Sequence, residues 1–217
     1  MQRKVFDVLA SAGGALIVIV LVVAGALLLV GYNFANNNVH SQLAEQQITF
    51  PAAAAFAHPV AGTEITPSMV GTVSKYAGEQ LTTGAQAQVY ANDFIAVHLK
   101  EIGGGLTYAQ LSQQAMALRV TTPNGTIVYP KGVAAYTKAE ATVQTVFQGT
   151  TLRGLLLEAY GFSVFATIAL WAAIAAFVGA GIMAVLVGFG IVHARKTDEA
   201  QELAVHTHTV TVEAQAA

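Results

Sequence analysis

The sequence predicts a mostly α-helical membrane protein, in which two transmembrane helices flank an α-rich extracytoplasmic domain with one possible β-hairpin. The main observation is a pair of long apolar segments near the two ends of the 217-residue chain. Charged residues make up only 10% of the chain, whereas soluble domains usually carry about 25%. The mixed stretch between the apolar segments holds about 120 residues, which is enough for one small domain.

The first apolar segment, residues 13–31, is predicted to be a transmembrane helix. It contains no charged residue, and about 20 apolar residues in a helix cross a bilayer core. Arg3 and Lys4 precede it, as in a signal peptide, and Ala-Gly-Ala at 24–26 resembles a cleavage site. The apolar run continues through 27–30, beyond that site, which favours an uncleaved signal anchor.

The second apolar segment, Gly154–Val192, is longer than a span requires and contains one charged residue, Glu158. We therefore expect a helix at the membrane surface over Leu155–Phe162, followed by the span itself at 163–192. Basic residues follow this span directly, at Arg195 and Lys196.

Basic residues thus precede the first apolar segment and follow the second, and segments rich in Lys and Arg beside a span stay in the cytoplasm. We expect the N-terminus (1–12) and the polar tail (193–217) to be cytoplasmic, and residues 32–162 to face the outside of the plasma membrane. The tail is predicted to be disordered. The opposite orientation would require both basic flanks to cross the bilayer.

The second span contains small residues at i, i+4 spacing, a pattern that lets another helix approach closely. This small-residue ladder consists of Ala172, Ala176, Ala180, Ala184 and Gly188. Three interpretations stay open: chance in an alanine-rich span, packing of the two spans on each other, and docking on another protein. The first span has a weaker counterpart at Ala10, Gly14 and Gly25-Ala26. Neither span contains Asp, Glu, Lys or Arg, so a channel or transporter is not expected.

Helices are predicted for much of the segment between the spans. Residues 36–47 continue the first span as a helix, and residues 49–80 form a loop with at most one short helix near 67–76. Further helices are expected at 85–102, 108–118 and 138–148, where apolar residues recur at helical spacing.

Polar and glycine residues mark the ends of these helices. Thr82 or Thr83 caps the helix at 85–102, and the glycines at 103–105 end it. Gly149-Thr150-Thr151 is expected to end the helix at 138–148 and to cap a new one before Leu152. Asn124-Gly125 lies between β-branched residues and predicts the hairpin.

Few residues suggest chemistry. Asp93, His98 and Glu101 lie on one predicted helix, but a metal site needs three or four convergent ligands, and nothing else on this helix supplies them. His206 and His208 in the tail indicate weak metal affinity at most. The chain has no cysteine, so it lacks thiolate nucleophiles and Cys-based metal sites. No cofactor is expected, and a net charge of −2 argues against nucleic-acid binding.

Four strings in the sequence are distinctive: QLAEQQITFP (42–51), YANDFIAVHLKEIGGGLTYAQLS (90–112), TLRGLLLEAYGF (151–162) and IALWAAIAAF (168–177). Through them the chain resembles a family of small actinobacterial membrane proteins that have two spans and an extracytoplasmic domain. Members are often labelled automatically as aromatic ring-opening dioxygenases. The resemblance covers most of residues 15–192 and implies the same topology, but it assigns no active-site residues. Residues 119–132 depart from the family pattern, which lacks the hairpin.

No enzymatic activity is expected. An iron-dependent ring-opening enzyme needs a site such as two histidines and a carboxylate, and the predicted exported segment contains only His40, His58 and His98. The expected function is that of an accessory subunit or scaffold in a cell-envelope or respiratory membrane assembly. Its partners would be the lipid bilayer and another membrane protein or a second copy, with Leu152–Trp171 as the contact surface. The alternative is an extracytoplasmic sensor or small-ligand-binding module, with the helix at 85–102 lining a pocket.

Overall fold

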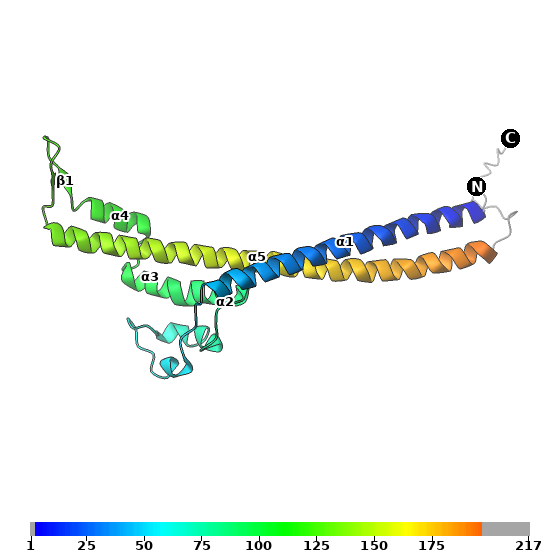
Figure 1. Cartoon of the computed structure of the whole chain (residues 1–217), viewed down its shortest axis with the longest axis horizontal. Coiled ribbons are helices and arrows are strands. Elements are labelled where there is room, and N and C mark those ends of the chain that lie inside the picture. Colours follow the sequence, from blue (N-terminus) through cyan, green and yellow to red (C-terminus); the bar gives the residue numbers. More distant parts are fainter. Residues whose placement is uncertain (1–2, 197–217) are drawn as a thin grey trace, which may run out of the picture. The chain divides into compact units, whose positions relative to one another are not determined.

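Two long helices dominate the structure (Figure 1). The computed structural model describes residues 3–196, and α1 comprises Arg3–Glu45 while α5 comprises Val133–Lys196. The structure is 75% helix and 3% strand, which confirms the predicted mostly α-helical class. The tail at 197–217, with His206 and His208, lies outside the described residues.

Both long helices are apolar and long enough to cross a membrane. Only 11% of the most apolar window of each helix is buried within the chain. A core helix of a soluble protein of the same length would be mostly buried. The two predicted apolar segments therefore lie on helices whose apolar side chains largely face away from the protein.

Short elements connect α1 to α5. Three 3₁₀-helices come first, then a composite helix with a π-helical centre, then a short helix and two strands. In chain order they are η1 (Ala53–Phe56), η2 (Pro67–Met69), η3 (Val73–Tyr76), α2 (Gly84–Val89), η4 (Tyr90–Ile95), α3 (Ala96–Ile102), α4 (Tyr108–Met116), β1 (Val120–Thr121) and β2 (Ile127–Val128). The strands pair antiparallel, with Val120 opposite Val128 and Thr121 opposite Ile127.

Capping boxes start two of the helices. Thr83 Oγ1 accepts the Gln86 N–H at 3.3 Å, and Gln86 Oε1 accepts the Thr83 N–H at 3.0 Å. The same reciprocal pair joins Thr107 and Gln110 at the start of α4. These bonds satisfy backbone donors that have no partner in the first turn. The cap expected at Thr82 or Thr83 is therefore confirmed at Thr83.

The segment between α1 and α2 differs from the prediction. It contains three short helices instead of at most one, and η1 lies outside the expected position near 67–76. The predicted helix at 85–102 is present, but its middle turn is π-helical. The helix expected at 36–47 is confirmed as the end of α1, which continues to Glu45.

One prediction about α5 is wrong. The helix does not break at Gly149-Thr150-Thr151, because α5 is continuous from Val133 to Lys196. Residues 155–162 are helical as expected, and their position at the membrane surface stays a prediction. A β-carbon at Gly149 would lie 2.5 Å from Leu99 Cδ2, so glycine here admits α3 against α5. This close approach offsets a helix propensity that costs about 1 kcal/mol relative to alanine.

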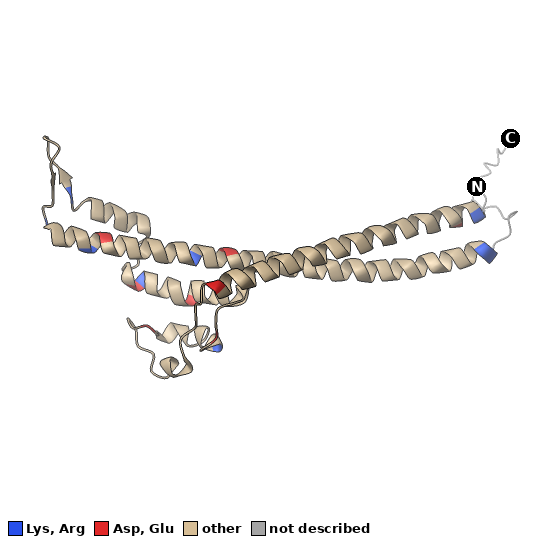
Figure 2. Ribbon diagram, viewed as in Figure 1, with Lys and Arg blue, Asp and Glu red and all other residues tan. Residues whose placement is uncertain are grey.

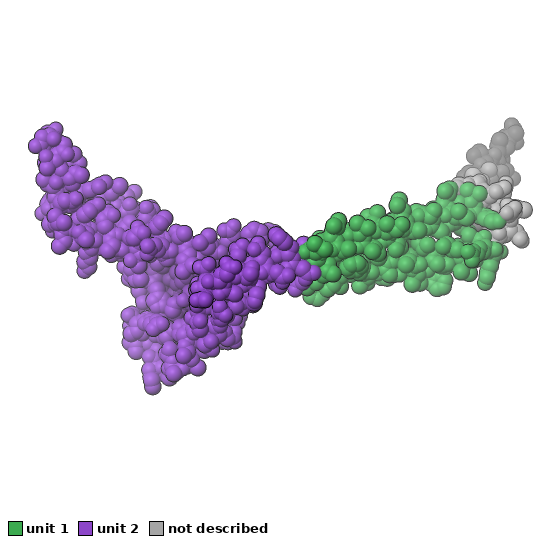
Figure 3. Space-filling view, viewed as in Figure 1, with its two compact units in different colours: residues 1–30, 169–217 green, residues 31–168 purple. Residues whose placement is uncertain are grey.

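The chain divides into two units (Figure 3). Unit 1 consists of Met1–Val30 with Ala169–Ala217, and unit 2 consists of Gly31–Ile168. Each long helix contributes one part to each unit.

Unit 2 has a hydrophobic core. Its largest fully buried side chains are Phe50, Met69, Val73 and Leu81. The N–H of Leu81 donates to the Ile48 carbonyl at 2.8 Å, and the N–H of Phe50 donates to the Glu79 carbonyl at 2.9 Å. These two bonds close the loop that supplies the largest buried side chains of the core. The long helices add Val39, Leu43 and Leu156 to the same core, so the loop is packed against them.

Candidate functional site

In unit 1, α1 and α5 pack against each other through glycines. A β-carbon at Gly14 would lie 2.6 Å from Val187 Cγ2, and one at Gly25 would lie 3.0 Å from Phe177 Cζ. A β-carbon at Gly190 would lie 2.6 Å from the hydroxyl oxygen of Ser11. The partners run in opposite sequence order, so the helices are antiparallel, and at these three positions a side chain larger than glycine would collide with the neighbouring helix.

The less exposed positions of this helix pair recur about every seven residues. On α5 they include Ala173, Ala180 and Ala194, which are buried, and on α1 they include Ser11 and Gly25. A seven-residue repeat is the packing period of coiled coils. We call this contact the seam of unit 1.

The small-residue ladder does not follow the seam. Four residues rotate a helix by about 40° more than one full turn, so five such positions spread over about 160°. Ala180 is buried at 4% exposure and Ala176 is half-buried. Ala172, Ala184 and Gly188 are exposed. Of the ladder residues, Ala180 is therefore buried by packing within the chain. Docking of the exposed ladder residues on a partner stays a prediction.

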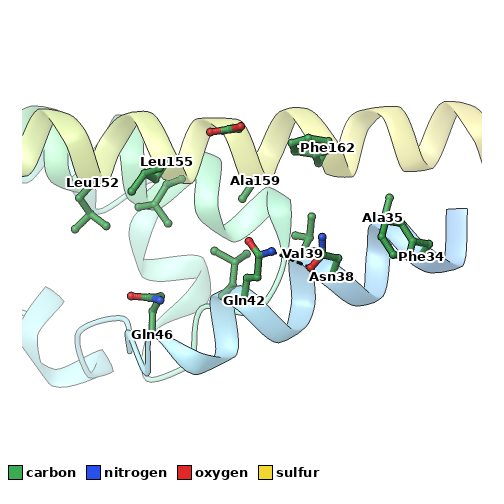
Figure 4. A pocket seen from close by; sticks show the side chains of 13 residues that line it. Phe34, Ala35, Asn38, Val39, Gln42, Gln46, Leu152, Leu155, Ala159 and Phe162 are labelled. Atoms are coloured by element: carbon green, nitrogen blue, oxygen red, sulfur yellow. Dashed lines mark hydrogen bonds between the residues drawn. The ribbon is translucent and has the colours of Figure 1, made fainter. Parts of the chain in front are cut away.

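Unit 2 carries an open apolar groove of about 540 Å³ between α1 and α5 (Figure 4). Phe34, Leu155 and Phe162 line it and are 72%, 59% and 54% exposed. In full, the groove is lined by Phe34, Ala35, Asn38, Val39, Gln42, Leu43, Gln46, Leu152, Leu155, Leu156, Glu158, Ala159 and Phe162. Part of the predicted contact segment Leu152–Trp171 thus forms one wall.

Side-chain amides line the other wall of the groove. Asn38 and Gln42 are four residues apart on α1, Gln46 follows the end of that helix, and Gln42 Nε2 donates to Asn38 Oδ1 at 2.8 Å. Figure 4 shows Gln46 at the same end of the groove as Leu152, and Phe34 at the same end as Phe162. The groove therefore combines an apolar interior with donors and acceptors on one wall.

The floor of the groove belongs to the core of unit 2. Val39, Leu43 and Leu156 line the groove and are also core residues. Arg153 Nη2 donates to Asn92 Oδ1 at 2.9 Å and so ties α5 to the π-helical turn. We infer that the groove is preformed, because the residues that shape it are packed from behind.

Sequence reasoning did not identify the α1 wall. Residues 36–47 were expected to form a helix, and no site was assigned to them. The signal was present in the spacing: Phe34, Asn38 and Gln42 are four residues apart, which places them on neighbouring turns of one helix face. Recognising it required knowing that α5 lies alongside.

A second cavity, of about 500 Å³, adjoins α3. Phe94, His98 and Ile102 line it together with Glu64 from the loop and Gln148 from α5. Burial raises the pKa of the nearby Tyr90 phenol above its ordinary value, and the charge of Glu64 raises it further.

The three candidate metal ligands do not converge. His98 Nδ1 lies 2.8 Å from the carbonyl oxygen of Phe94, and Glu101 Oε1 accepts the N–H of Gly62 at 3.3 Å. Within residues 3–196, no group of three or more His, Asp or Glu side chains is arranged to hold a metal ion. His98 is instead a lining residue of the second cavity.

No protein-family model, curated protein or solved structure matches this chain. The resemblance to two-span actinobacterial proteins therefore stays a prediction. The groove of unit 2, the second cavity beside α3 and the seam of unit 1 are the structural features that bear on function.

Proposed function

We propose that this protein is an integral membrane protein with two spans that acts by contact, as an accessory subunit or scaffold of a cell-envelope or respiratory membrane assembly. The groove of unit 2 carries the proposal. It exposes Phe34, Leu155 and Phe162 together on a preformed surface, and contiguous apolar patches of this kind mark interaction sites.

The distribution of charge supports the proposed topology. Figure 2 marks basic residues at the described start of α1 and the described end of α5, where they are Lys4, Arg195 and Lys196. Between these ends and unit 2, both helices are apolar. By the positive-inside rule, both termini are cytoplasmic and unit 2 is extracytoplasmic.

The contacts of α1 also support an uncleaved first span. Gly14 and Gly25 both adjoin side chains of α5. Cleavage near 24–26 would remove the partner of the seam and leave the small residues of α5 without the helix they fit. The first apolar segment thus acts as a structural half of unit 1.

The groove suits an amphipathic helix of another membrane protein. From Phe34 to Leu43, its first and last lining residues, the α1 wall measures about 14 Å, or two and a half helical turns, at 1.5 Å per residue. Helices dock in such grooves with apolar residues at i, i+3/i+4 and i+7. Glu158 is the one charged residue among the lining residues, so a Lys or Arg on the docked helix would complement it.

A matched pair of substitutions tests this proposal in the full-length protein. Leu155 and Val133 lie on the same helix and are 59% and 60% exposed, but only Leu155 lines the groove. After extraction in mild detergent, wild type and Val133→Asp should retain one membrane protein at fixed stoichiometry. Leu155→Asp should lose it.

Cross-linking identifies the occupant. A photo-reactive side chain at position 155 should cross-link to a helix of that same protein. A lone wild-type monomer, or equal retention by both Asp variants, would contradict the proposal. Cross-links to a second copy of this chain would replace the separate partner with a homo-oligomer.

The second cavity favours the alternative function, an extracytoplasmic module that binds a small ligand. Its lining combines apolar side chains with Glu64, and Phe94 supplies an aromatic face, a combination that suits an organic cation. Alkylammonium compounds should then raise the melting temperature of the full-length protein, and Glu64→Gln should abolish the shift. No shift with the wild type would leave this function unsupported.

A further inference from the structure

Unit 1 contains a groove that the proposed function does not use. It has a volume of about 550 Å³ and lies between the first turns of α1 and the last turns of α5. Lys4 and Arg195 line it together with Ser11, and its apolar lining includes Val8, Ala12 and Ile191. The small side chains at Ala12 and Ser11 leave the space between the helices open.

The groove pairs two cationic side chains with an apolar surface. Lys4 has three N–H donors and Arg195 has five, so each can bind phosphate oxygens in addition to protein groups. Val8 and Ile191 are exposed apolar residues on the two helices. A ligand that matches both parts carries a phosphate at one end and a hydrocarbon chain at the other.

We propose that this groove binds an anionic phospholipid of the cytoplasmic leaflet. The phosphodiester contacts Lys4 and Arg195, and one acyl chain lies along Val8, Ala12 and Ile191. Basic pockets between membrane helices on the cytoplasmic side recognise anionic headgroups in this way. The site requires the two-span topology proposed above, but it does not require the partner protein or the groove of unit 2.

The charges around the groove favour an anion. Among residues 3–196, Asp7 is the acidic residue near the groove: its Oδ2 lies 3.8 Å from His193 Nε2, and it lines a smaller adjoining cavity instead of this groove. Both charged residues that line the groove are basic. Lys196 follows Arg195 directly and adds to the positive charge at this end of α5.

Lipid binding can be measured on the full-length protein in detergent by native mass spectrometry, with phosphatidylglycerol and phosphatidylcholine as probes. Wild type should retain one phosphatidylglycerol per chain and should prefer it to phosphatidylcholine. Lys4→Gln with Arg195→Gln should weaken phosphatidylglycerol binding roughly twenty-five-fold, at about fivefold per basic residue. The control is Lys100→Gln with Lys138→Gln, which removes two exposed lysines of unit 2.

A second pair of variants tests the acyl-chain contact at constant charge. Ala12→Phe should fill the groove and weaken phosphatidylglycerol binding, whereas Gly13→Phe should not, because a β-carbon at Gly13 meets nothing within 4 Å. Inorganic phosphate should not displace the lipid at millimolar concentration.

Three results would overturn the inference: equal retention of the two lipids, unchanged binding in the Lys4/Arg195 variant, or displacement by phosphate alone, which would indicate a site for a free anion. Each can occur while the Leu155→Asp experiment still succeeds, so failure of the lipid site is distinguishable from failure of the proposed docking function.

Discussion

Gly13 and Gly14 are adjacent in the sequence, yet only one of them contributes to the seam. A β-carbon at Gly14 would collide with Val187, whereas one at Gly13 would meet nothing within 4 Å. Composition alone cannot separate them, because both read as small residues in an apolar span. The difference arises from the rotation of about 100° that a helix makes per residue.

We predict opposite effects for alanine at these two positions. Gly14→Ala should destabilise unit 1 by about 1–3 kcal/mol, the range found for overpacked contacts. Gly13→Ala should be neutral or stabilising by up to about 1 kcal/mol, because alanine has the higher helix propensity. Denaturant unfolding in detergent measures both, and a Gly14→Ala variant as stable as Gly13→Ala would refute the close approach.

Tyr90 provides a pH-dependent prediction. Burial, and then the charge of Glu64, raise its pKa in the folded state, while the phenol of the unfolded chain ionises near pH 10. Its contribution to stability is therefore fully present below about pH 10 and is lost as the pH rises through the folded-state pKa. Tyr90→Phe keeps the ring and removes the titrating group, so its unfolding free energy should fall less on the alkaline side.

The matched control is Tyr108→Phe, which alters an exposed tyrosine outside the core. This variant should keep the alkaline loss of the wild type. Chemical denaturation at a series of pH values around 10 measures how the unfolding free energy changes with pH. An identical pH dependence for wild type and Tyr90→Phe would exclude Tyr90 as the source of the alkaline loss.

At the scale of elements, the two long apolar helices and most of the other helices could be predicted from the sequence, and the continuity of α5 could not. Gly149-Thr150-Thr151 has the composition of a helix break, but the residues on both sides favour helix. Leu99 packs where a side chain at position 149 would be, and this tertiary contact is invisible in the local sequence. The π-helical turn at Tyr90–Ile95 was missed for another reason: over six residues, its apolar side chains repeat almost as they do in an α-helix.

The candidate interaction sites were predicted only in part. The ladder was identified from its i, i+4 spacing, but packing follows a seven-residue repeat, so just Ala180 became fully buried. The α5 wall of the groove was anticipated as part of Leu152–Trp171, whereas the α1 wall was not. Both shortfalls arise because a single helix pattern does not reveal which face its neighbour covers.

The contact between α2 and α5 offers a test by compensation. A β-carbon at Gly84 would overlap Ser163 Cβ and lie 3.3 Å from Tyr160 Cα, so Gly84→Ala should destabilise unit 2. Adding Ser163→Gly should restore part of the loss, with a coupling energy on the order of 1 kcal/mol or more. A double-mutant cycle of unfolding free energies measures it, and strict additivity would show that the two residues do not touch.

Two rungs of the ladder separate packing within the chain from docking on a partner. Ala180→Leu inserts volume into the seam and should destabilise unit 1 by about 1–3 kcal/mol. Ala184→Leu changes an exposed position and should leave unfolding unchanged. If the exposed rungs dock on the partner, Ala184→Leu should lower its copurification; unaltered copurification would confine the ladder to the seam.

At the scale of the whole molecule, the topology can be tested directly, because the chain contains no cysteine. Val60 is exposed in unit 2, and Val60→Cys should react with a membrane-impermeant maleimide in intact cells. Gln201→Cys should react only after the membrane is permeabilised. Labelling of Gln201→Cys in intact cells would show that the proposed orientation is reversed or that one of the two apolar helices does not cross the membrane.

Unit 1 and unit 2 are each stabilised internally by a different kind of packing. Unit 2 buries large side chains such as Phe50, Met69 and Leu81, and its stability derives from apolar area removed from water. Unit 1 buries mainly glycine and alanine, and in the bilayer proposed above its apolar surface would have no comparable driving force. Substitutions that enlarge a residue should therefore be most harmful in unit 1, and those that shorten one most harmful in unit 2.

The seam has a further consequence for how unit 1 assembles. Gly14, Gly25, Ala173 and Ala180 have no side-chain rotamers to lose, so bringing them together carries almost no penalty in side-chain conformational entropy. Helix association at such a contact needs little attraction to be favourable. In the two-span arrangement proposed above, α1 and α5 can then associate as soon as both have entered the bilayer, and the loop that supplies the largest core side chains of unit 2 folds between ends that are already joined.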